Sequence, residues 1–259
     1  MSTEVQMLDT EDLERRVKEM YREVAEEPFK DFHFETGRAL AERLGYPRAE
    51  LDAIPADAID SFAGVGYYFD LARIQPGETV IDLGSGSGMD SLLAARQAGE
   101  SGRVIGIDMT DAQLTKARRL AIEHGVANVE FVHARIEQLP LPAASADVVI
   151  SNGVINLSPD KTTVFAEAAR VLRPGGRLAL ADIVTSTQLP VGVTCDASLW
   201  AACIGGAVQR DDYRDAIEAA GFELHDLKEN DQYRFVSERA DRATKKYGVK
   251  SVSLLAIKC

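Results

Sequence analysis

A glycine-rich loop carries the clearest chemical signal in the sequence. Residues 80–90 read VIDLGSGSGMD, so an apolar stretch with Asp82 near its end runs into Gly84, Gly86 and Gly88. Glycines let the backbone turn tightly and let a ligand approach it closely, because no Cβ stands in the way. Such a loop at the carboxyl end of a strand predicts a ligand site, although glycines also serve ordinary strand-to-helix turns.

Asp108 strengthens the prediction of a ligand site. It ends the apolar segment RVIGID, which follows the helical segment after the glycine loop. An acidic side chain at that position can accept two hydrogen bonds from ribose hydroxyls. The loop and Asp108 together therefore predict a ligand that contains a nucleoside.

The spacing of the loop distinguishes between two nucleoside ligands. A dinucleotide site favours G-x-G-x-x-G, but the sixth position counted from Gly84 is Met89, and Asp90 at the helix start would oppose a phosphate. An acid at Asp82 before G-x-G-x-G suits a zwitterionic amino-acid tail, which S-adenosylmethionine carries. We therefore predict S-adenosylmethionine as the cofactor, with an NAD-dependent oxidoreductase as the alternative.

Alternating apolar and amphipathic segments predict the fold around this loop. We expect an α/β fold with a doubly wound, mostly parallel, seven-stranded sheet of Rossmann-like type, because apolar strands alternate with helices. The four later core strands are apolar runs, which indicates that both faces of the sheet are covered. Two late strands can close the sheet with an antiparallel edge. The expected strands are 79–83, 103–108, 129–134, 146–152, 177–184, 222–230 and 249–259, and the expected helices include 89–99, 111–125 and one around 235–246.

The first part of the chain has a different pattern and predicts a helical cap. Leu13, Val17 and Val24 recur at helical spacing after a predicted N-cap at Thr10, and a second helix over about 35–44 should end at Gly45. We therefore divide the chain into a helical cap, residues 1–75, and a cofactor-binding domain, residues 76–259.

Composition limits the partners and the compartment. The formal net charge is −12, which discourages binding to nucleic acid or anionic lipid. No apolar run is long enough to span a membrane, and the acidic N-terminal segment lacks the apolar core of a signal peptide. Three scattered cysteines suit a reducing, cytoplasmic environment. We expect a small-molecule substrate, no nucleic acid, no membrane and no metal centre.

These segments resemble the class I S-adenosylmethionine-dependent methyltransferases over most of residues 76–220. VIDLGSGSG is similar to the family's first motif, GIDMT to its ribose segment, ARIEQLPLP to its adenine segment, and RVLRPGGRLALAD to its turn into the fifth strand. The resemblance implies methyl transfer to a small-molecule acceptor. It also implies cofactor contacts from Asp82, Gly84, Ser85, Gly86, Gly88, Asp108, Met109, Ile136, Glu137, Ser151 and Asn152.

A narrower resemblance points to the arsenite methyltransferase branch. ISNGVINLSPDKTTVFAEAARVLRPGGRL and LWAACIGGA are similar to that branch, in which S-N-C-V-I-N-L carries an arsenic-binding cysteine. This chain has Gly153 at that position and keeps Cys203 in CIGGA, and no cysteine precedes Cys195. Trivalent arsenic is a soft centre that thiolates bind best. The loss of most of these cysteines therefore bears on whether arsenic is the acceptor, but not on the prediction of the cofactor.

Several further residues are candidates for the acceptor site. The candidate catalytic residues are Cys203, Asp182 after the fifth strand, and His33 in the cap as a base. Free cysteines are also commonly buried as small apolar residues, and a histidine in a helical segment is commonly structural. Aromatic residues beside flexible glycines suit a lid, although they equally suit the core of the cap. The candidate substrate residues are Tyr67, Tyr68, Gly153, Asn156, Cys195 and Trp200.

Two sequence patterns of nucleic-acid methyltransferases are absent, which narrows the class of methyl acceptor. The segment after the fourth strand reads Ser151-Asn152-Gly153-Val154 rather than the Asn/Asp-Pro-Pro-aromatic pattern of nucleic-acid amino-methyltransferases, and no Pro-Cys pair occurs. A small-molecule acceptor is therefore predicted. Because the substrate thiols are reduced in number, a non-catalytic S-adenosylmethionine-binding protein is a further alternative.

Overall fold

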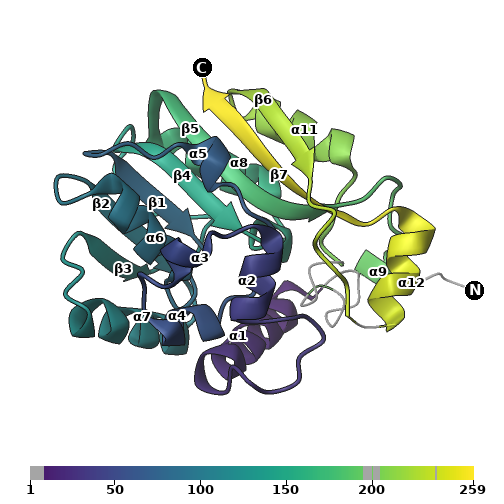
Figure 1. Cartoon of the computed structure of the whole chain (residues 1–259). Coiled ribbons are helices and arrows are strands. Elements are labelled where there is room, and N and C mark those ends of the chain that lie inside the picture. The colour runs from purple at the N-terminus through teal and green to yellow at the C-terminus, as the bar shows by residue number, and fades with distance from the viewer. Residues whose placement is uncertain (1–8, 195–199, 201–204, 237) are drawn as a thin grey trace, which may run out of the picture.

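One seven-stranded sheet forms the centre of the molecule (Figure 1). The computed structural model describes residues 9–194, 200, 205–236 and 238–259. The strands follow the order β3-β2-β1-β4-β5-β7-β6. They are β1 (Thr79–Leu83), β2 (Arg103–Asp108), β3 (Val129–His133), β4 (Ala146–Asn152), β5 (Leu172–Val184), β6 (Phe222–Glu229) and β7 (Lys250–Lys258).

The pairing of the strands confirms the predicted doubly wound sheet. β1 pairs in parallel with both β2 and β4, so the strand order reverses between β1 and β4. β7 runs antiparallel between β5 and β6, which confirms the antiparallel edge. Ligands of open α/β sheets bind where the order reverses, at the carboxyl ends of the strands.

Two strands differ from their predicted form. β5 begins at Leu172 rather than at 177, and the RPGG segment forms a bulge opposite β4, because Ala146 pairs with Leu172 while Val148 already pairs with Arg177. β3 ends at His133 and buries only Phe131 fully, so it is not an apolar run covered on both faces. Its position at the edge of the sheet explains this, because an edge strand is open to water.

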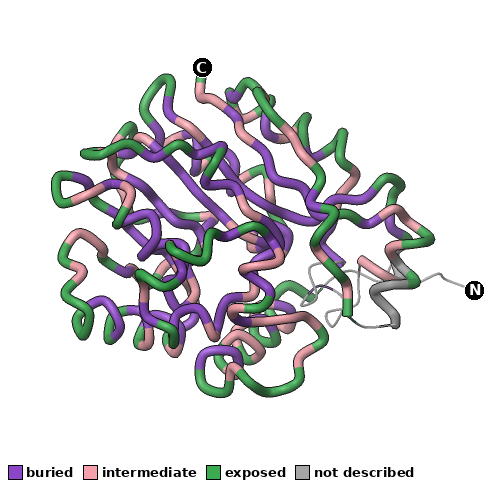
Figure 2. The backbone as a smooth tube through the Cα atoms, viewed as in Figure 1, coloured by how far each residue is buried: buried purple, intermediate pink, exposed green. Residues whose placement is uncertain are grey.

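Helices cover both faces of the sheet, and the burial pattern in Figure 2 follows these layers. The side chains of α6 (Met89–Ala98) and α7 (Asp111–Glu123) join one core, which extends to the short N-terminal helices. The side chains of α8 (Lys161–Val171) and α11 (Arg210–Ala219) join a second core on the other face. The remaining elements are a 3₁₀ turn η1 (Ile155–Leu157), α9 (Val191–Thr194) and α12 (Glu238–Tyr247). No helix among the described residues is both long and apolar enough to cross a bilayer.

The N-terminal helices are α1 (Thr10–Glu26), α2 (Arg38–Leu44), α3 (Arg48–Leu51), α4 (Ala56–Asp60) and α5 (Phe69–Ala72). Among them, α1 and α4 pack on α7, and α5 packs on β5 and β7. Gly45 ends α2 in the left-handed conformation, as predicted. The predicted cap of α1 at Thr10 is wrong by one residue, because the side chain of Asp9 accepts hydrogen bonds from the backbone amides of Glu11 and Asp12.

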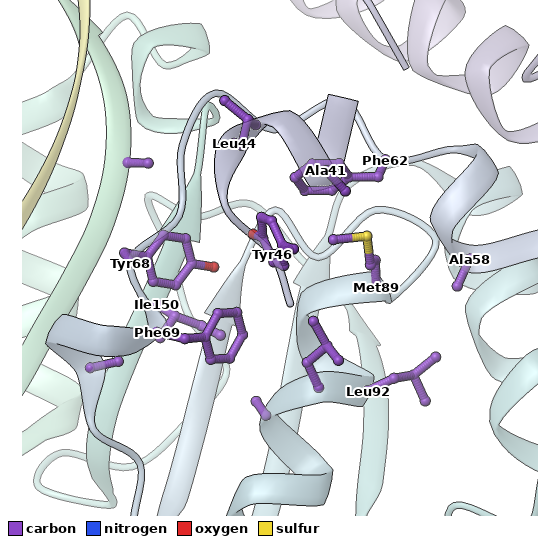
Figure 3. Close-up of a cluster of buried hydrophobic side chains, with 14 of the residues drawn as sticks. Ala41, Leu44, Tyr46, Ala58, Phe62, Tyr68, Phe69, Met89, Leu92 and Ile150 are labelled. Atoms are coloured by element: carbon purple, nitrogen blue, oxygen red, sulfur yellow. The ribbon is translucent and has the colours of Figure 1, made fainter. Parts of the chain in front are cut away.

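Aromatic side chains fill the space between these helices and the sheet (Figure 3). Tyr46, Tyr68 and Phe69 are buried there, beside Leu92 of α6. The ring centroids of Tyr46 and Phe69 are 6.1 Å apart, and those of Tyr68 and Phe69 are 5.2 Å apart. Tyr68 is therefore part of the core, rather than of a mobile aromatic lid.

Candidate functional site

A cavity lies at the carboxyl ends of β1, β2 and β4, with α1 along its side. Thr10, Leu13, Glu14, Val17 and Tyr21 of α1 contribute to its wall. Nine of the residues predicted to bind the cofactor line it: Asp82, Gly84, Ser85, Gly86, Asp108, Met109, Ile136, Glu137 and Asn152. The fold therefore brings together residues from six separate segments of the sequence.

The glycine loop takes a backbone path that other residues would disturb. Gly84 has a φ of +71°, and a Cβ added there would lie 2.3 Å from a methyl carbon of Val154. The amides of Gly84 and Ser85 both donate to the carbonyl of Ile107, at 2.8 and 2.9 Å. These bonds hold the loop against β2, with its backbone exposed to the cavity.

Gly88 serves the fold rather than the cavity wall. It occupies the N-cap position of α6, and a Cβ there would lie 2.8 Å from the ring of Phe131. It is not among the residues that line the cavity. Direct contact between Gly88 and a ligand is therefore not supported.

Asp108 is fixed at the end of β2 by two backbone groups. Its Oδ2 accepts from the amide of Gly86 at 2.9 Å, and its Oδ1 accepts from the amide of Thr110 at 2.8 Å. Each carboxylate oxygen can accept a further hydrogen bond, so both can still accept from ribose hydroxyls. Burial raises the pKa of Asp108, while the two backbone amides oppose that rise.

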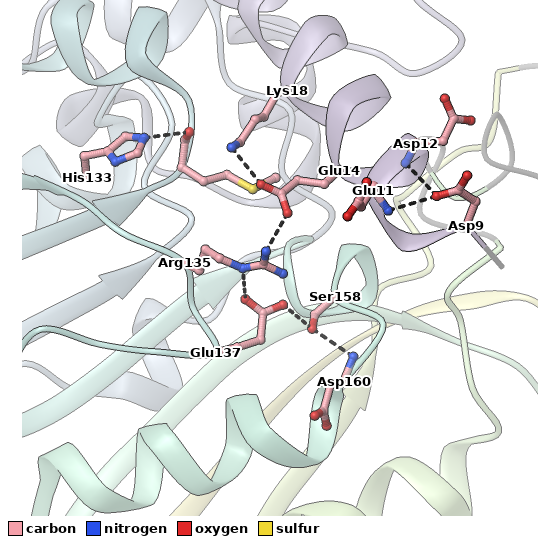
Figure 4. A network of polar contacts seen from close by, with 11 residues as sticks. Asp9, Glu11, Asp12, Glu14, Lys18, His133, Arg135, Glu137, Ser158 and Asp160 are labelled. Atoms are coloured by element: carbon pink, nitrogen blue, oxygen red, sulfur yellow. Dashed lines mark hydrogen bonds and ion pairs between the residues drawn. The ribbon is translucent and has the colours of Figure 1, made fainter.

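A chain of charged groups joins α1 to the predicted adenine segment (Figure 4). Arg135 donates from Nη1 to Glu14 of α1 at 2.5 Å, and its Nε lies 3.5 Å from Glu137. Glu137 also accepts a hydrogen bond from the hydroxyl of Ser158 at 2.6 Å. Lys18 pairs with Glu14 at 2.7 Å. These contacts position Glu137 and hold α1 beside the cavity.

Asp82 is a buried carboxyl group in the cavity wall. Only 2% of its surface is exposed, and its Oδ2 accepts a hydrogen bond from Ser91 at 2.6 Å. Burial, and then the nearby charge of Asp90, raises the pKa of Asp82 to about 8. Both effects disfavour the anion, so the group is poised to ionise when a cation arrives.

Asp90 is a site residue that sequence reasoning missed. It lines the cavity, its oxygens accept from Tyr46 at 2.8 and 3.0 Å, and Oδ2 accepts from Tyr68 at 2.7 Å. The side-chain amide of Asn152 donates to the same Oδ2 at 3.1 Å. Burial raises the pKa of Asp90, against these three donors. The available sequence signal was an acid in the first turn of the helix after the glycine loop.

The donor set fits the predicted cofactor. The hydroxyl of Ser85 is buried in this region and has no hydrogen-bond partner among the described groups, which is expected where a polar ligand supplies one. Asp108 suits a ribose, and Asp82 and Asp90 suit the positive groups of S-adenosylmethionine. The residues present therefore match a nucleoside with a cationic amino-acid tail.

Asp182 lies outside the lining of the cavity, rather than on its substrate side as predicted. It is 1% exposed, and its Oδ2 accepts from the amide of Asn156 at 3.1 Å and from the hydroxyl of Tyr213 at 3.0 Å. Burial raises its pKa to about 6. Neither Asp182 nor Asn156 lines the cavity, because both side chains tie β5 to η1 and α11.

Three other predicted residues also stand outside the cavity lining. The hydroxyl of Ser151 is buried and donates to the carbonyl of Leu83 at 3.1 Å. Gly153 packs against Val65, and the half-buried ring of Tyr67 lies 5.0 Å from that of Tyr46. These three residues therefore make contacts within the protein and do not line the cavity.

The remaining predictions concern His33, Trp200 and two cysteines. His33 is exposed, with its ring edge-on to Phe34 at 5.0 Å, and it does not line the cavity. Trp200 is buried against Leu13 and Val17 of α1, so it supports α1. The predictions for Cys195 and Cys203 fall outside the described residues.

Comparison with known proteins identifies the family. A family described as a methyltransferase domain matches residues 74–221. An arsenite methyltransferase from Halobacterium salinarum is 41% identical over 215 residues, which are 82% of this chain and 55% of that protein. An arsenite methyltransferase from Aquipseudomonas alcaligenes is 43% identical over 60% of this chain and 48% of that protein. The chain thus spans about half the length of these relatives.

A solved structure agrees with the sequence matches. The arsenic(III) S-adenosylmethionine methyltransferase from Chlamydomonas reinhardtii is 32% identical and superposes with a TM-score of 0.69. The match covers 85% of this chain and 73% of that one. S-adenosylmethionine is the cofactor of this family, in agreement with the glycine loop and Asp108. The chain belongs to the S-adenosylmethionine-dependent methyltransferases, in the branch that resembles the arsenite methyltransferases.

Proposed function

We propose that the chain transfers the methyl group of S-adenosylmethionine to a small-molecule acceptor. The observation that carries this proposal is that the glycine loop, Asp108 and Glu137 line the same cavity. Buried carboxyl groups at both Asp82 and Asp90 favour a cationic ligand over the pyrophosphate of a dinucleotide.

Each segment of the cavity has a proposed task. S-adenosylmethionine supplies, when bound, an electrophilic methyl group on a sulfonium sulfur. We assign ribose binding to Asp108, the adenine edge to Ile136 and Glu137, and the amino-acid end to Asp82 and the loop backbone. Val17, Tyr21 and Leu157 line the cavity beside them and exclude water. Catalysis then consists mainly of holding the acceptor in line with the methyl group.

The acceptor is proposed as a class rather than a compound. The names of the relatives favour trivalent arsenic, which soft thiolate ligands select. Within the described part of the chain, however, Cys259 is the only cysteine, and it is exposed at the end of β7. Acceptors with carbon, nitrogen, oxygen or sulfur nucleophiles therefore belong in the same test as arsenite.

The organisation and location of the protein are part of the proposal. We propose residues 1–75 as a cap and 76–259 as the methyltransferase domain, because α1 supplies one wall of a cavity built mostly by later residues. We also propose a reducing, cytoplasmic location, based on the few scattered cysteines.

Release of S-adenosylhomocysteine tests the function directly. The protein and cofactor are incubated with arsenite, methylarsenite, selenite and a panel of small phenols and amines. Mass spectrometry then quantifies the S-adenosylhomocysteine released. Acceptor-dependent release supports methyl transfer. Binding of cofactor without release across the panel favours the non-catalytic alternative, and Cys203→Ser shows whether a thiophilic acceptor uses that thiol.

A further inference from the structure

We infer that Lys161 is a positioning residue that transmits occupation of the adenine end of the cavity to Trp200. The inference rests on the proposed function, since it takes the nucleoside of the methyl donor as the ligand of the cavity. Neither Lys161 nor Trp200 lines the cavity. A response of Trp200 to the ligand must therefore pass through the protein, and the contacts of Lys161 define a route for it.

The first contact of Lys161 is with the wall at the adenine end. Its ammonium group, in the first residue of α8, donates to the carbonyl of Ser158 at 2.9 Å. Ser158 lines the cavity, and its hydroxyl donates to Glu137 at 2.6 Å (Figure 4). One residue thus separates Lys161 from the carboxylate that we assign to the adenine edge.

The second contact of the same ammonium group is with the ring of Trp200. The nitrogen lies 5.1 Å from the centroid of the ring. A cation at this distance is attracted by the electrons of the ring face, and the attraction is stronger where water is excluded. Trp200 is only 6% exposed, so this condition is met. Lys161 therefore links the carbonyl of Ser158 to one position of the indole ring.

The ring of Trp200 is enclosed, so it responds to a shift of the groups around it. Its Nε1 donates to the carbonyl of Thr194 at 2.5 Å. The ring packs with Leu13 and Val17 of α1, and both of these side chains line the cavity. A Cβ added to Gly206 would lie 2.7 Å from the ring, which leaves no room for a side chain there.

Gly206 also meets the wall that Lys161 holds. A Cβ at Gly206 would lie 1.8 Å from the carbonyl oxygen of Asn156, in η1. The same carbonyl oxygen lies 3.5 Å from the ammonium nitrogen of Lys161. Trp200 and Gly206 stand on either side of Cys203 in the sequence, which is the candidate thiol for a thiophilic acceptor. The route therefore leads from the nucleoside towards the acceptor side of the reaction.

Ligand binding acts on this route at Glu137. An adenine amino group that donates to Glu137 shares the carboxylate with the hydroxyl of Ser158. Hydrogen bonds in a chain polarise one another, so the new bond alters the contact between Ser158 and Lys161. Lys161 passes this change to Trp200 through its interaction with the ring.

The fluorescence of Trp200 tests the inference, because the sequence contains a single tryptophan. The full chain is titrated with S-adenosylmethionine while its emission is recorded, and calorimetry under the same conditions measures binding. We expect the emission of the wild-type protein to change as the ligand binds. Lys161→Met removes the charge and the donor but keeps the length of the side chain. It should lose at least about half of the change in emission, whereas the Kd should rise less than about fivefold because Lys161 does not contact the ligand.

Three further variants define the role of the cation and of the route. Lys161→Arg keeps a cation and its donors and should retain the response. Ser158→Ala breaks the bond to Glu137 but leaves the carbonyl that Lys161 holds, and it should reduce the response as well. It also keeps the inference testable if Lys161→Met does not fold. The control Lys228→Met removes the same charge from a partly exposed position on β6 and should leave the response unchanged.

Four results would overturn the inference. They are binding of S-adenosylmethionine to the wild-type protein without a change in emission, a response of full size in Lys161→Met, a response of full size in Ser158→Ala, and equal losses in Lys161→Arg and Lys161→Met. A full response in the Met or Ala variant would assign the signal to the packing of α1 on Trp200. Failure of the wild-type protein to bind the compound in the calorimeter would instead reject the proposed function itself. Calorimetry reports binding and fluorescence reports its transmission, so the two failures are distinguishable.

Discussion

Gly153 and Val65 lie close together, next to residues that line the cavity but outside its lining. A Cβ added to Gly153 would stand 3.1 Å from a methyl carbon of Val65, and Gly153 has a φ of +71°. The branch of the family that methylates arsenite carries a cysteine at this position, so the contact bears on which acceptor the protein uses.

Restoring that cysteine should destabilise the protein. Gly153→Cys places a side chain in the left-handed region and against Val65, at an expected cost of about 1–3 kcal/mol in unfolding free energy. Urea denaturation measures this cost. Val65→Ala opens space beside position 153, so Gly153→Cys should cost less in that background. Equal costs in both backgrounds would show that the contact with Val65 is unimportant.

Removing the carboxylate of Asp108 should weaken cofactor binding. The side chain accepts from two backbone amides and has acceptor capacity left for a ligand. Asp108→Ala is expected to cost about 1.5–3 kcal/mol of binding free energy, the range for hydrogen bonds to a charged group. Calorimetry measures the effect, and Asp111→Ala, at an exposed side chain nearby, serves as the control. Unchanged affinity in Asp108→Ala would remove Asp108 from the site.

Cofactor affinity should increase with pH because Asp82 has a raised pKa. Its carboxyl group loses its proton near pH 8 in the ligand-free protein, and a bound cation favours the ionised form. Below the pKa, binding of the cation must release the proton of Asp82, which weakens the apparent affinity. The Kd of S-adenosylmethionine should therefore fall as the pH rises from 6 to 8.5. Asp82→Asn should abolish most of this dependence, and a Kd in the wild-type protein that does not vary with pH would contradict the assignment.

The stability of the ligand-free protein should change with pH in the opposite direction. Because Asp82 and Asp182 have pKa values raised to about 8 and about 6, folding favours their protonated forms. The stability that this gives is present at low pH and is lost as the pH rises through those values. Denaturation at pH 5, 7 and 9 should show that the free energy of unfolding declines as the pH rises. The double variant Asp82→Asn/Asp182→Asn should show a smaller decline. An unaltered profile in that variant would assign the decline to other groups.

Gln113 should hold α1 beside the cavity. Its Oε1 accepts from Ser87 of the glycine loop at 2.5 Å, and its Nε2 donates to the carbonyl of Tyr21 in α1 at 2.8 Å. Gln113→Leu removes both bonds, each worth about 1 kcal/mol. Hydrogen exchange in residues 10–26 should become faster, whereas Gln138→Leu, at an exposed position, should leave it unchanged. Protection of α1 equal to that of the wild-type protein would show that its packing on Trp200 suffices.

The sheet and half of the site could be predicted from sequence because their signals are local. Strand periodicity identified β1, β2 and β4, and the glycine loop with Asp108 lies within one strand–helix–strand unit. The Asp90 cluster could not be predicted this way, because its hydroxyl partners come from positions 44 and 22 residues away. Only the tertiary structure, which places Tyr46 and Tyr68 beside the first turn of α6, brings them together.

The packing partner of α1 could not be predicted from the sequence either. An amphipathic helix shows which face is buried, but not against what, so the contact of Leu13 with Trp200 needed the tertiary structure. The same limit applies to Asp182. Its predicted position after the fifth strand suggested a contact with substrate, but Asp182 lies within β5. The hydroxyl of Tyr213, from a helix about thirty residues away, shows it to be an internal anchor.

The position of β7 has a consequence for how the chain is made. β7 pairs with both β5 and β6, although it follows them in the sequence. While a ribosome is still synthesising the chain, β5 therefore has an unpaired edge and β6 has no partner until residues 250–258 emerge. Nascent chains with open strand edges are prone to aggregate, so the synthesis of β7 completes both the pairing of β5 and β6 and their protection.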